Sequence, residues 1–328
     1  MSLSRRRFAA GLAILPVAAS GLPASAARPA RVKVGPGGHQ TIASALAALP
    51  AEGGQIAIAP GVYREKLSIE APGVSLIGLG RRPQDVVLVW GDGARTAGGT
   101  FKSYSLNVSG DDFTARNLTI QNDYHLRDAQ RSQAVALAIT GDCAVLDKVV
   151  LLGAQDTLYA ASRKGGPPSR QYFHRCRIEG HVDFIFGDAK AFFDACQIHT
   201  IANDEILITA QSKTTPDQDS AYVFDRCVIS AEPQAKNVYL GRAWRPYATV
   251  IFMRTDIRAP LNPAGWREWH PGKTTTLDTA YFAEFASSGP GGDVSAREPR
   301  THQLTAAQAA RWAKGPFLAG ADGWRPKV

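Results

Sequence analysis

Several features are missing from the body of this sequence, and each absence excludes a class of protein. No run of lysine or arginine follows residue 30, which counts against a nucleic-acid-binding protein. No stretch of about 20 apolar residues occurs, so a membrane span is not expected. The seven histidines show no close metal-ligand spacing, so we predict neither a zinc site nor any other cofactor.

The overall composition is that of a folded protein with a basic surface. Of the 328 residues, 45% are hydrophobic and 20% are charged, which is neither a disordered nor a collagen-like composition. The formal charge is +8 and the pI is about 9.4. A basic surface suits a polyanionic partner, which could be nucleic acid or an acidic polysaccharide. Because the body of the chain has no basic run, the polysaccharide is the favoured partner.

The first 26 residues have the pattern of an export signal. Arg5, Arg6 and Arg7 precede an apolar run from Phe8 to Ala19, and a small-residue cleavage site follows at residues 24–26. The adjacent arginines resemble a twin-arginine signal, although an ordinary secretory leader has a similar plan. We therefore expect a periplasmic or secreted protein without a membrane anchor, whose mature chain is one domain over residues 27–328. A monomer is expected from that single domain.

Downstream of the leader, the pattern changes from one helix to many short strands. Thr41–Leu49 has an N-cap threonine and an apolar face, which predict a helix that could cover one end of the fold. Residues 305–312 predict a second helix on the outside. Between them, short β-prone runs alternate with turns. These runs are residues 55–58, 73–77, 86–89, 105–108, 117–121 and 135–139.

A loose repeat runs through the centre of the chain. An aromatic residue leads to an isoleucine in residues 113–120, 172–178, 192–198 and 222–229, and in the last three a cysteine stands two residues before that isoleucine. Cys176 and Cys196 are 20 residues apart, which is about one coil of a β-solenoid. Equivalent residues of adjacent coils lie about 4.8 Å apart, so a Cys176–Cys196 disulfide is possible. Two buried free thiols are the alternative.

Four polar residues stand at or beside strand-like segments. Asp183 lies in an apolar run, where a carboxylate is costly unless it is paired. Asp156 and Arg242 follow strand-like segments, and Gln133 begins another. Each residue alone has an ordinary structural explanation, such as a turn or a solvent-facing strand position. Their spacing nevertheless puts all four on neighbouring or near-neighbouring coils, where one cleft could contain them.

These segments resemble the pectin methylesterase (pectinesterase) family. The resemblance is carried by Gly61-Val-Tyr-Arg-Glu65, Gln133-Ala-Val-Ala-Leu137, Gly153-Ala-Gln-Asp-Thr-Leu158, Val182-Asp-Phe-Ile-Phe-Gly187 and Leu240-Gly-Arg-Ala-Trp244. Shorter matches occur around Thr100, at residues 208–212 and at residues 265–269. The match covers about residues 31 to 325. It implies an all-β fold, a right-handed parallel β-helix, and a carbohydrate esterase whose partner is methyl-esterified polygalacturonate.

The resemblance also implies a role for each matched residue. Asp183 would be the nucleophile and Asp156 the general acid and then the general base. Gln133 and Gln155 would stabilise the oxyanion, and Arg242 would hold Asp183. The residues expected to contact the sugar are Trp244, Thr100, Phe184 and Tyr159.

The sequence departs from the family pattern at several positions. Ala243 stands where proline is usual, His181 replaces a smaller residue, and Lys213 replaces arginine. These changes affect the substrate pattern rather than the reaction type. Two alternatives are a β-helix enzyme of another reaction, such as a glycosidase, a lyase or an esterase for another acyl group, and a non-catalytic glycan-binding protein. A lyase would need a denser acidic cluster, and a binding protein would be expected to have lost a catalytic aspartate.

Overall fold

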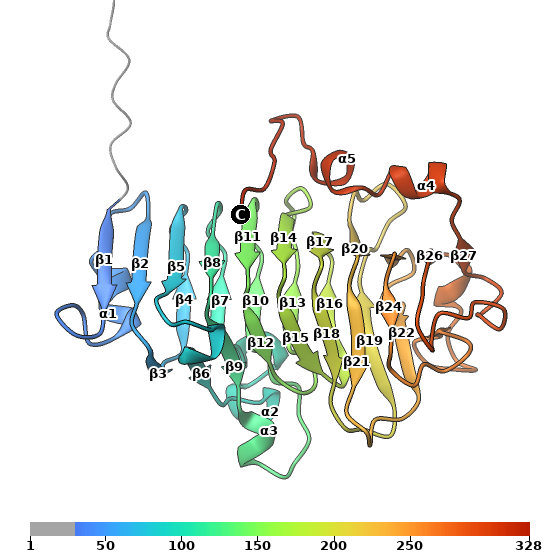
Figure 1. Ribbon diagram of the computed structural model, residues 1–328, viewed down its shortest axis with the longest axis horizontal. Coiled ribbons are helices and arrows are strands. Elements are labelled where there is room, and N and C mark those ends of the chain that lie inside the picture. The colour runs from blue at the N-terminus through green and yellow to red at the C-terminus, as the bar shows by residue number, and fades with distance from the viewer. Residues whose placement is uncertain (1–29) are drawn as a thin grey trace, which may run out of the picture.

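A computed structural model describes residues 30–328 of the chain. The predicted export signal at residues 1–26 lies outside these described residues. All named strand pairs are parallel, and the strands form three long sheets that wind around one core as a right-handed parallel β-helix (Figure 1). The predicted fold class is therefore confirmed.

Three sheets, here called A, B and C, form the sides of the helix. Sheet A consists of β1 (Arg31–Val34), β2 (Gly54–Ile58), β5 (Val74–Gly78), β8 (Thr114–Arg116), β11 (Ala144–Asp147), β14 (Arg170–His174), β17 (Lys190–Asp194), β20 (Ala221–Asp225), β23 (Thr249–Met253), β26 (Tyr281–Phe285) and β27 (His302–Gln303). Sheet B consists of β3 (Gly61–Arg64), β6 (Val86–Trp90), β9 (Thr119–Asn122), β12 (Val150–Leu152), β15 (Arg177–Gly180), β18 (Gln197–Thr200), β21 (Val228–Ala231) and β24 (Asp256–Ile257). Sheet C consists of β4 (Leu67–Ile69), β7 (Leu106–Val108), β10 (Leu137–Ile139), β13 (Leu158–Ala160), β16 (Val182–Gly187), β19 (Ile206–Gln211), β22 (Val238–Arg242) and β25 (Trp266–Arg267).

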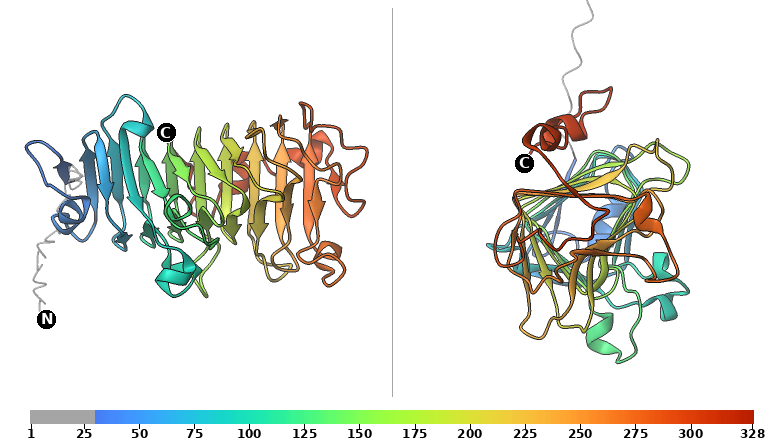
Figure 2. Two further views of the ribbon diagram at one scale, coloured as in Figure 1. Left: turned by 90° about the horizontal axis from the view of Figure 1, so that it is seen from below. Right: turned by 90° about the vertical axis from the view of Figure 1, so that its right-hand side faces the viewer.

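Short helices lie at the ends and in the loops. They are α1 (Ile42–Ala47), α2 (Ala94–Ala97), α3 (Tyr124–Arg127), α4 (Ala306–Ala310) and α5 (Lys314–Leu318), with 3₁₀ turns η1 (Pro83–Asp85), η2 (Thr100–Lys102) and η3 (Thr276–Asp278). The predicted helices at 41–49 and 305–312 correspond to α1 and α4. Viewed along the long axis, α4 and α5 lie outside the β-helix (Figure 2).

The turn between sheets A and B repeats on seven coils. At this turn a non-glycine residue adopts a left-handed conformation with φ between 47° and 54°: Asn117, Lys148, Arg175, Ala195, Arg226, Arg254 and Ala286. Such a conformation costs about 1–2 kcal/mol per residue. The N–H of Ala195 donates to the carbonyl of Asp225 on the next coil at 2.9 Å, so the turn keeps its hydrogen bond between coils.

The aromatic–cysteine–isoleucine repeat corresponds to this turn. Phe173, Phe193, Phe224 and Phe252 stack inside sheet A with ring centroids 4.3–4.6 Å apart. Three of the seven left-handed residues are followed by a cysteine that is buried in the core, and strand pairing puts two of these, Cys176 and Cys196, on adjacent coils as predicted.

The cysteine stack contains no disulfide. All four cysteines are free thiols. The Cys176 thiol donates to the carbonyl of Leu146 and the Cys196 thiol to that of Phe173, both at 3.4 Å. Of the two alternatives, the structure has the free thiols, and each of these two thiols makes a hydrogen bond to the backbone of the preceding coil.

Helix α1 covers the N-terminal end of the core. The Thr41 side chain accepts a hydrogen bond from the Ser44 amide at 3.0 Å, as an N-cap residue does. The Glu65 carboxylate accepts from the amides of Ile42 and Ala43 at 2.8 and 2.9 Å. Ile42 and Ala45 are buried against the first coil. Glu65, in a segment that carries the family resemblance, thus fixes this helix to the first coil.

Candidate active site

The predicted polar residues converge on sheet C. Gln133 precedes β10, Gln155 and Asp156 precede β13, Asp183 lies in β16 and Arg242 ends β22. In sheet C these strands follow one another in the order β10, β13, β16, β19, β22. A cleft of about 300 Å³ opens there, lined by all five residues together with Thr100, Phe101, Phe186, Ala210, Trp244 and Trp269.

The backbone at Asp183 is irregular. Asp183 has a φ of 50°, and the pairing of β16 with β19 shifts register between Val182 and Ile185. A simple alternation would carry the Asp183 side chain to the face opposite Val182 and Phe184. In the structure Phe184 does lie in the core and the Asp183 side chain in the cleft, where its exposure is only 5%. The alternation fails after Phe184, since Ile185 also lies in the core and Phe186 lines the cleft.

Asp156 uses the same backbone conformation on the preceding coil. Its φ is 65°, and its amide donates to the carbonyl of Val182 at 3.1 Å. Residues with left-handed backbone are concentrated at functional sites, where surrounding structure compensates for the strain. Here the hydrogen bond between the coils provides part of that compensation. Both aspartates of the cleft are thus held by left-handed backbone.

A bidentate ion pair joins Asp183 to Arg242. The Arg242 Nε donates to Asp183 Oδ1 at 2.9 Å and its Nη2 to Asp183 Oδ2 at 2.6 Å. The Trp269 carbonyl accepts from Arg242 Nη1 at 3.2 Å, and the guanidinium lies 3.9 Å from the centroid of the Trp269 ring. Two parallel bonds fix the carboxylate plane, and the tryptophan fixes the arginine.

The two aspartates have different electrostatic environments. Burial, and then the charge of Asp183, raise the pKa of Asp156 well above its ordinary value, and Arg242 only partly opposes this. Burial also raises the pKa of Asp183, but the hydrogen bonds and charge of Arg242 oppose that rise directly. In the described residues, the Asp156 carboxylate makes no ion pair. Asp183 is therefore the better anion of the two, and Asp156 the better proton carrier.

The two glutamine side chains are free to act in the cleft. The backbone carbonyls of Gln133 and Gln155 accept from the amides of Ala94 and Ala134 at 2.7 and 3.0 Å, which fixes both main chains. Among residues 30–328, neither side-chain amide makes a hydrogen bond to protein, so both N–H groups remain available to a bound molecule.

Aromatic rings form one wall of the cleft. The ring centroids of Phe101 and Tyr159, and of Tyr159 and Phe186, are 4.9 Å apart. Trp244 continues this wall, 6.0 Å from Phe186 and 6.3 Å from Trp269. Tyr159 and Trp244 also line an adjoining cavity, so the wall leads away from the aspartates.

Phe184 does not belong to this wall. Its side chain is fully buried in the core, so its prediction as a sugar contact is wrong. Phe186, two residues further along β16, takes the position in the cleft. Sequence reasoning also missed Phe101, Ala210 and Trp269. Phe101 and Trp269 both lie in short stretches that carried the resemblance.

No metal site is evident in the described part of the chain. Residues 30–328 contain no group of three or more histidine, cysteine, aspartate or glutamate side chains arranged to hold a metal ion. The cleft itself has two carboxylates, and Arg242 occupies both oxygens of one of them.

Comparison with known proteins identifies relatives along almost the whole described chain. The Pectinesterase family model matches residues 31–321. Pectinesterase QRT1 of Arabidopsis thaliana is 33% identical over 89% of this chain and 77% of its own length. Pectinesterase 2 of Citrus sinensis is 33% identical over 89% of this chain, which spans 57% of that longer protein.

Solved structures agree with these relatives. The pectin methylesterase from carrot superimposes with a TM-score of 0.81 at 29% identity, covering 91% of this chain and 95% of its own. A pectin methylesterase in complex with a hexasaccharide has a TM-score of 0.72 at 29% identity, covering 88% of this chain and 94% of its own.

Proposed function

Because the chain belongs to the pectinesterase family, we propose that it hydrolyses the methyl esters of polygalacturonate to pectate and methanol with Asp183 as nucleophile. The observation that carries this proposal is the pairing of Asp183 with Arg242 next to Asp156, whose pKa is raised and which makes no ion pair within residues 30–328. An ionised carboxylate and a protonated carboxyl group in one cleft are the two partners that an aspartyl esterase needs.

The first step forms an acyl-enzyme. A carboxylate oxygen of Asp183 attacks the ester carbonyl carbon, and the carbonyl oxygen becomes an oxyanion. The side-chain amides of Gln133 and Gln155 donate to that oxyanion, and an amide donor of this kind is worth about 3–4 kcal/mol in other enzymes. Asp156 gives its proton to the methoxy oxygen as the bond from the carbonyl carbon to that oxygen breaks. Methanol leaves, and galacturonate remains joined to Asp183 as an anhydride.

The second step returns the enzyme to its starting state. Asp156, now a carboxylate, takes a proton from water while the water oxygen attacks the acyl carbon. The bond between that carbon and Asp183 breaks, and the product is a galacturonate carboxyl group. Arg242 stabilises Asp183 as its negative charge returns.

The polymer would lie along the aromatic wall. Trp244, Tyr159 and Thr100 remain the proposed sugar contacts, joined by Phe186 and Trp269 from the structure. Pyranose rings pack their C–H faces on aromatic rings, which bury apolar area and leave the hydroxyl groups free.

The cellular location is part of the proposal. We expect export by the signal at residues 1–26, to the periplasm or the medium, as a monomer. Among the helices of residues 30–328, none has the length and apolar character needed to cross a membrane.

The decisive experiment measures methanol release from highly methylated pectin with excess chelator. Wild type is expected to release methanol, and Asp183→Asn to release it at least about 10³-fold more slowly. Circular dichroism and melting would verify that the variant is folded. Absence of release by folded wild type would reject the pectin esterase, and normal release by the variant would reject Asp183 as nucleophile.

A further inference from the structure

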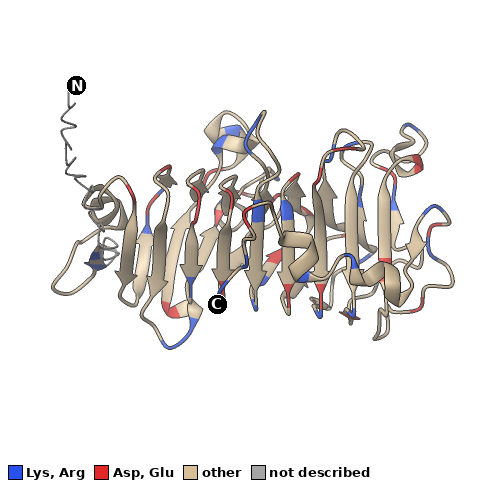
Figure 3. Cartoon of the chain, turned by 90° about the horizontal axis from the view of Figure 1, so that it is seen from above, with Lys and Arg blue, Asp and Glu red and all other residues tan. Residues whose placement is uncertain are grey.

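The C-terminal segment lies on a different side of the β-helix from the cleft. After β27 the chain runs back along the outer face of sheet A (Figures 1 and 3). Trp312 packs 6.1 Å from Tyr281 of β26, and Phe317 packs 6.2 Å from Phe192 of β17. The cleft residues belong to sheet C, so the two surfaces are separate.

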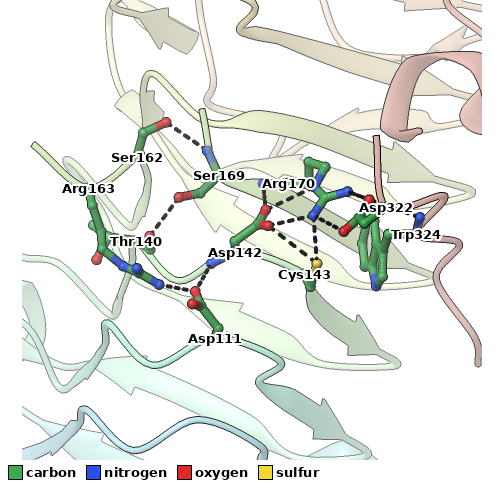
Figure 4. A network of polar contacts seen from close by, with 10 residues as sticks. All are labelled: Asp111, Thr140, Asp142, Cys143, Ser162, Arg163, Ser169, Arg170, Asp322 and Trp324. Carbon is green, nitrogen blue, oxygen red and sulfur yellow. Dashed lines mark hydrogen bonds and ion pairs between the residues drawn. The ribbon is translucent and has the colours of Figure 1, made fainter. Parts of the chain in front are cut away.

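Arg170 of β14 fixes the end of this segment. Its Nη1 and Nη2 donate to the two carboxylate oxygens of Asp322 at 2.7 and 2.8 Å, and its Nε and Nη2 donate to Asp142 at 3.0 and 2.6 Å (Figure 4). The guanidinium lies 5.3 Å from the centroid of the Trp324 ring. Two aspartates pair with Arg170, so these three side chains together carry a net charge of −1, and the Trp324 amide donates to Asp322 at 3.1 Å.

Other cations of the segment remain unneutralised. Arg311, Arg325 and Lys327 are exposed, and none of them takes part in an ion pair within residues 30–328. Lys314 differs, because its Nζ lies 3.6 Å from Asp194. The segment therefore presents three free positive charges on a fixed backbone.

Each free cation stands beside a tryptophan and a cavity. One cavity of about 570 Å³ is lined by Trp324, Arg325 and Lys327, by Thr114 and Val145 of sheet A, and by Asp112, Cys143 and Gly323. A second, of about 300 Å³, is lined by Arg311, Trp312 and Tyr281 among others. Asp112 is the one carboxylate in the first cavity, against two cations. In the second, Lys190 pairs with Asp219 at 2.5 Å.

We propose that Arg311, Trp312, Trp324, Arg325 and Lys327, called here the C-terminal surface, form a second binding site for de-esterified polygalacturonate. Tryptophan rings suit the C–H faces of sugar rings, and arginine and lysine suit their carboxylates. From β26 to β8 the surface crosses six strand spacings, roughly 29 Å, so it can follow an extended chain.

The proposed activity would produce the polymer that this surface binds. The inference rests on that activity for the identity of the polymer, since hydrolysis creates the carboxylates that the surface binds. Pectin bound there by a de-esterified stretch would present its methylated stretches to the cleft at a raised local concentration. Short oligomers, which cannot reach both surfaces, would gain nothing.

The test compares the triple variant Trp324→Ala, Arg325→Glu, Lys327→Glu with a control of equal charge change, Arg81→Glu with Lys148→Glu. Both carry their changes at exposed or half-buried positions, and melting would check their folding. Binding of long polygalacturonate is measured at low salt by calorimetry, in wild type and in the Trp244→Ala background that weakens the cleft. Dextran sulfate and single-stranded DNA serve as comparison polyanions.

The proposal predicts that the triple variant binds polygalacturonate about five- to tenfold more weakly in both backgrounds, while the control stays within twofold. KM for long pectin should rise by a similar factor, with kcat unchanged and with unchanged kinetics on a methylated hexamer. Binding equal to that of the control, or an equal loss for dextran sulfate or DNA, would overturn it. Failure of the proposed esterase would show separately, as no methanol from the hexamer with wild type.

Discussion

Sheet A and sheet C contribute strands to the same coils, but the stacking is regular in sheet A and interrupted in sheet C. In sheet A, four phenylalanine rings stack at 4.3–4.6 Å with planes within 12° of parallel. In sheet C, the register shifts between Val182 and Ile185, where Asp183 adopts a left-handed backbone. Uniform stacking holds the coils in register in sheet A, and the break in sheet C leaves Phe184 and Ile185 both in the core and puts Phe186 in the cleft beside Asp183.

Both regions nevertheless use the same backbone conformation. At the turn from sheet A to sheet B, left-handed residues such as Ala195 and Lys148 only turn the chain. Asp156 and Asp183, which line the cleft, adopt the same conformation. The difference between the regions therefore lies in the side chains and their burial.

The largest effect is expected at Asp156. Asp156→Asn removes the proton carrier at constant shape, so kcat for methanol release should fall by about 10²–10⁴-fold. The matched control is Asp147→Asn in sheet A, since Asp147 is 7% exposed and Asp156 is 8% exposed. The control should keep the kcat of wild type in its folded fraction. An equal loss in both variants would show that the effect is structural.

A change in the aromatic stack should lower stability and leave kcat unchanged, the opposite of the change at Asp156. Phe193→Ala leaves a cavity between Phe173 and Phe224, so unfolding free energy should fall by about 3–5 kcal/mol. Its kcat, measured well below the unfolding transition, should stay within about twofold of wild type. Urea unfolding would measure the loss of stability, and a methanol-release assay would measure kcat. A lost kcat in a folded variant would mean that the stack positions the cleft directly.

Gln155 should matter for the transition state alone. Gln155→Ala removes one oxyanion donor, and kcat should fall by about 10²–10³-fold with little change in melting. Gln171 is the matched control, because its amide donates to the carbonyls of Ile139 and Ala161, both at 3.0 Å, inside the β-helix. Gln171→Ala should lower stability and spare kcat. The reverse result would contradict the assigned donor.

The pH dependence of stability gives a smaller effect. The pKa of Asp156 is raised in the folded protein, so protonation of this residue stabilises the fold at any pH below the ordinary pKa of an aspartate. That contribution is lost as the pH rises through the raised pKa of the folded state. Asparagine cannot ionise, so Asp156→Asn should be more stable than wild type at high pH by about 1–2 kcal/mol. The gain should disappear at low pH. Urea unfolding across pH would show it, and a gain that grows as pH falls would contradict the sign.

The cysteines should give the smallest effect. Because all four are free, a reductant should leave the melting temperature unchanged to within about 1 °C. Alkylation of the unfolded, unreduced protein followed by mass measurement should label all four. A mass that shows only two labelled cysteines would show that the other two form a disulfide.

Much of the fold was readable from the sequence because the repeat is local. The helices at 41–49 and 305–312, the strand-rich body and the offset of Cys176 and Cys196 by one coil all follow from hydrophobic pattern and spacing. Helix α5 was missed, since it is five residues long and contains Gly315 and Pro316, which are unfavourable in helices. It forms because Phe317 and Leu318 pack on sheet A.

The sequence predicts the polar members of the site and part of its wall, since Tyr159 and Trp244 are among the expected sugar contacts. Phe184 was expected there from the family resemblance, but the irregular backbone near Asp183 leaves Phe184 and Ile185 in the core and puts Phe186 in the cleft. The placement of Cys176 and Cys196 on adjacent coils was also inferred from the spacing, whereas the direction of each thiol depends on side-chain rotamers that spacing does not specify.

Glu65 shows how a solenoid is kept finite. A stack of parallel strands has no intrinsic last member, and an uncovered end would accept a strand of another molecule and extend into a fibre. By holding the first amides of α1, this one carboxylate keeps an apolar lid over that end. The carboxylate that ends the Gly-Val-Tyr-Arg-Glu segment therefore helps to protect the open edge of the first coil from pairing with another molecule.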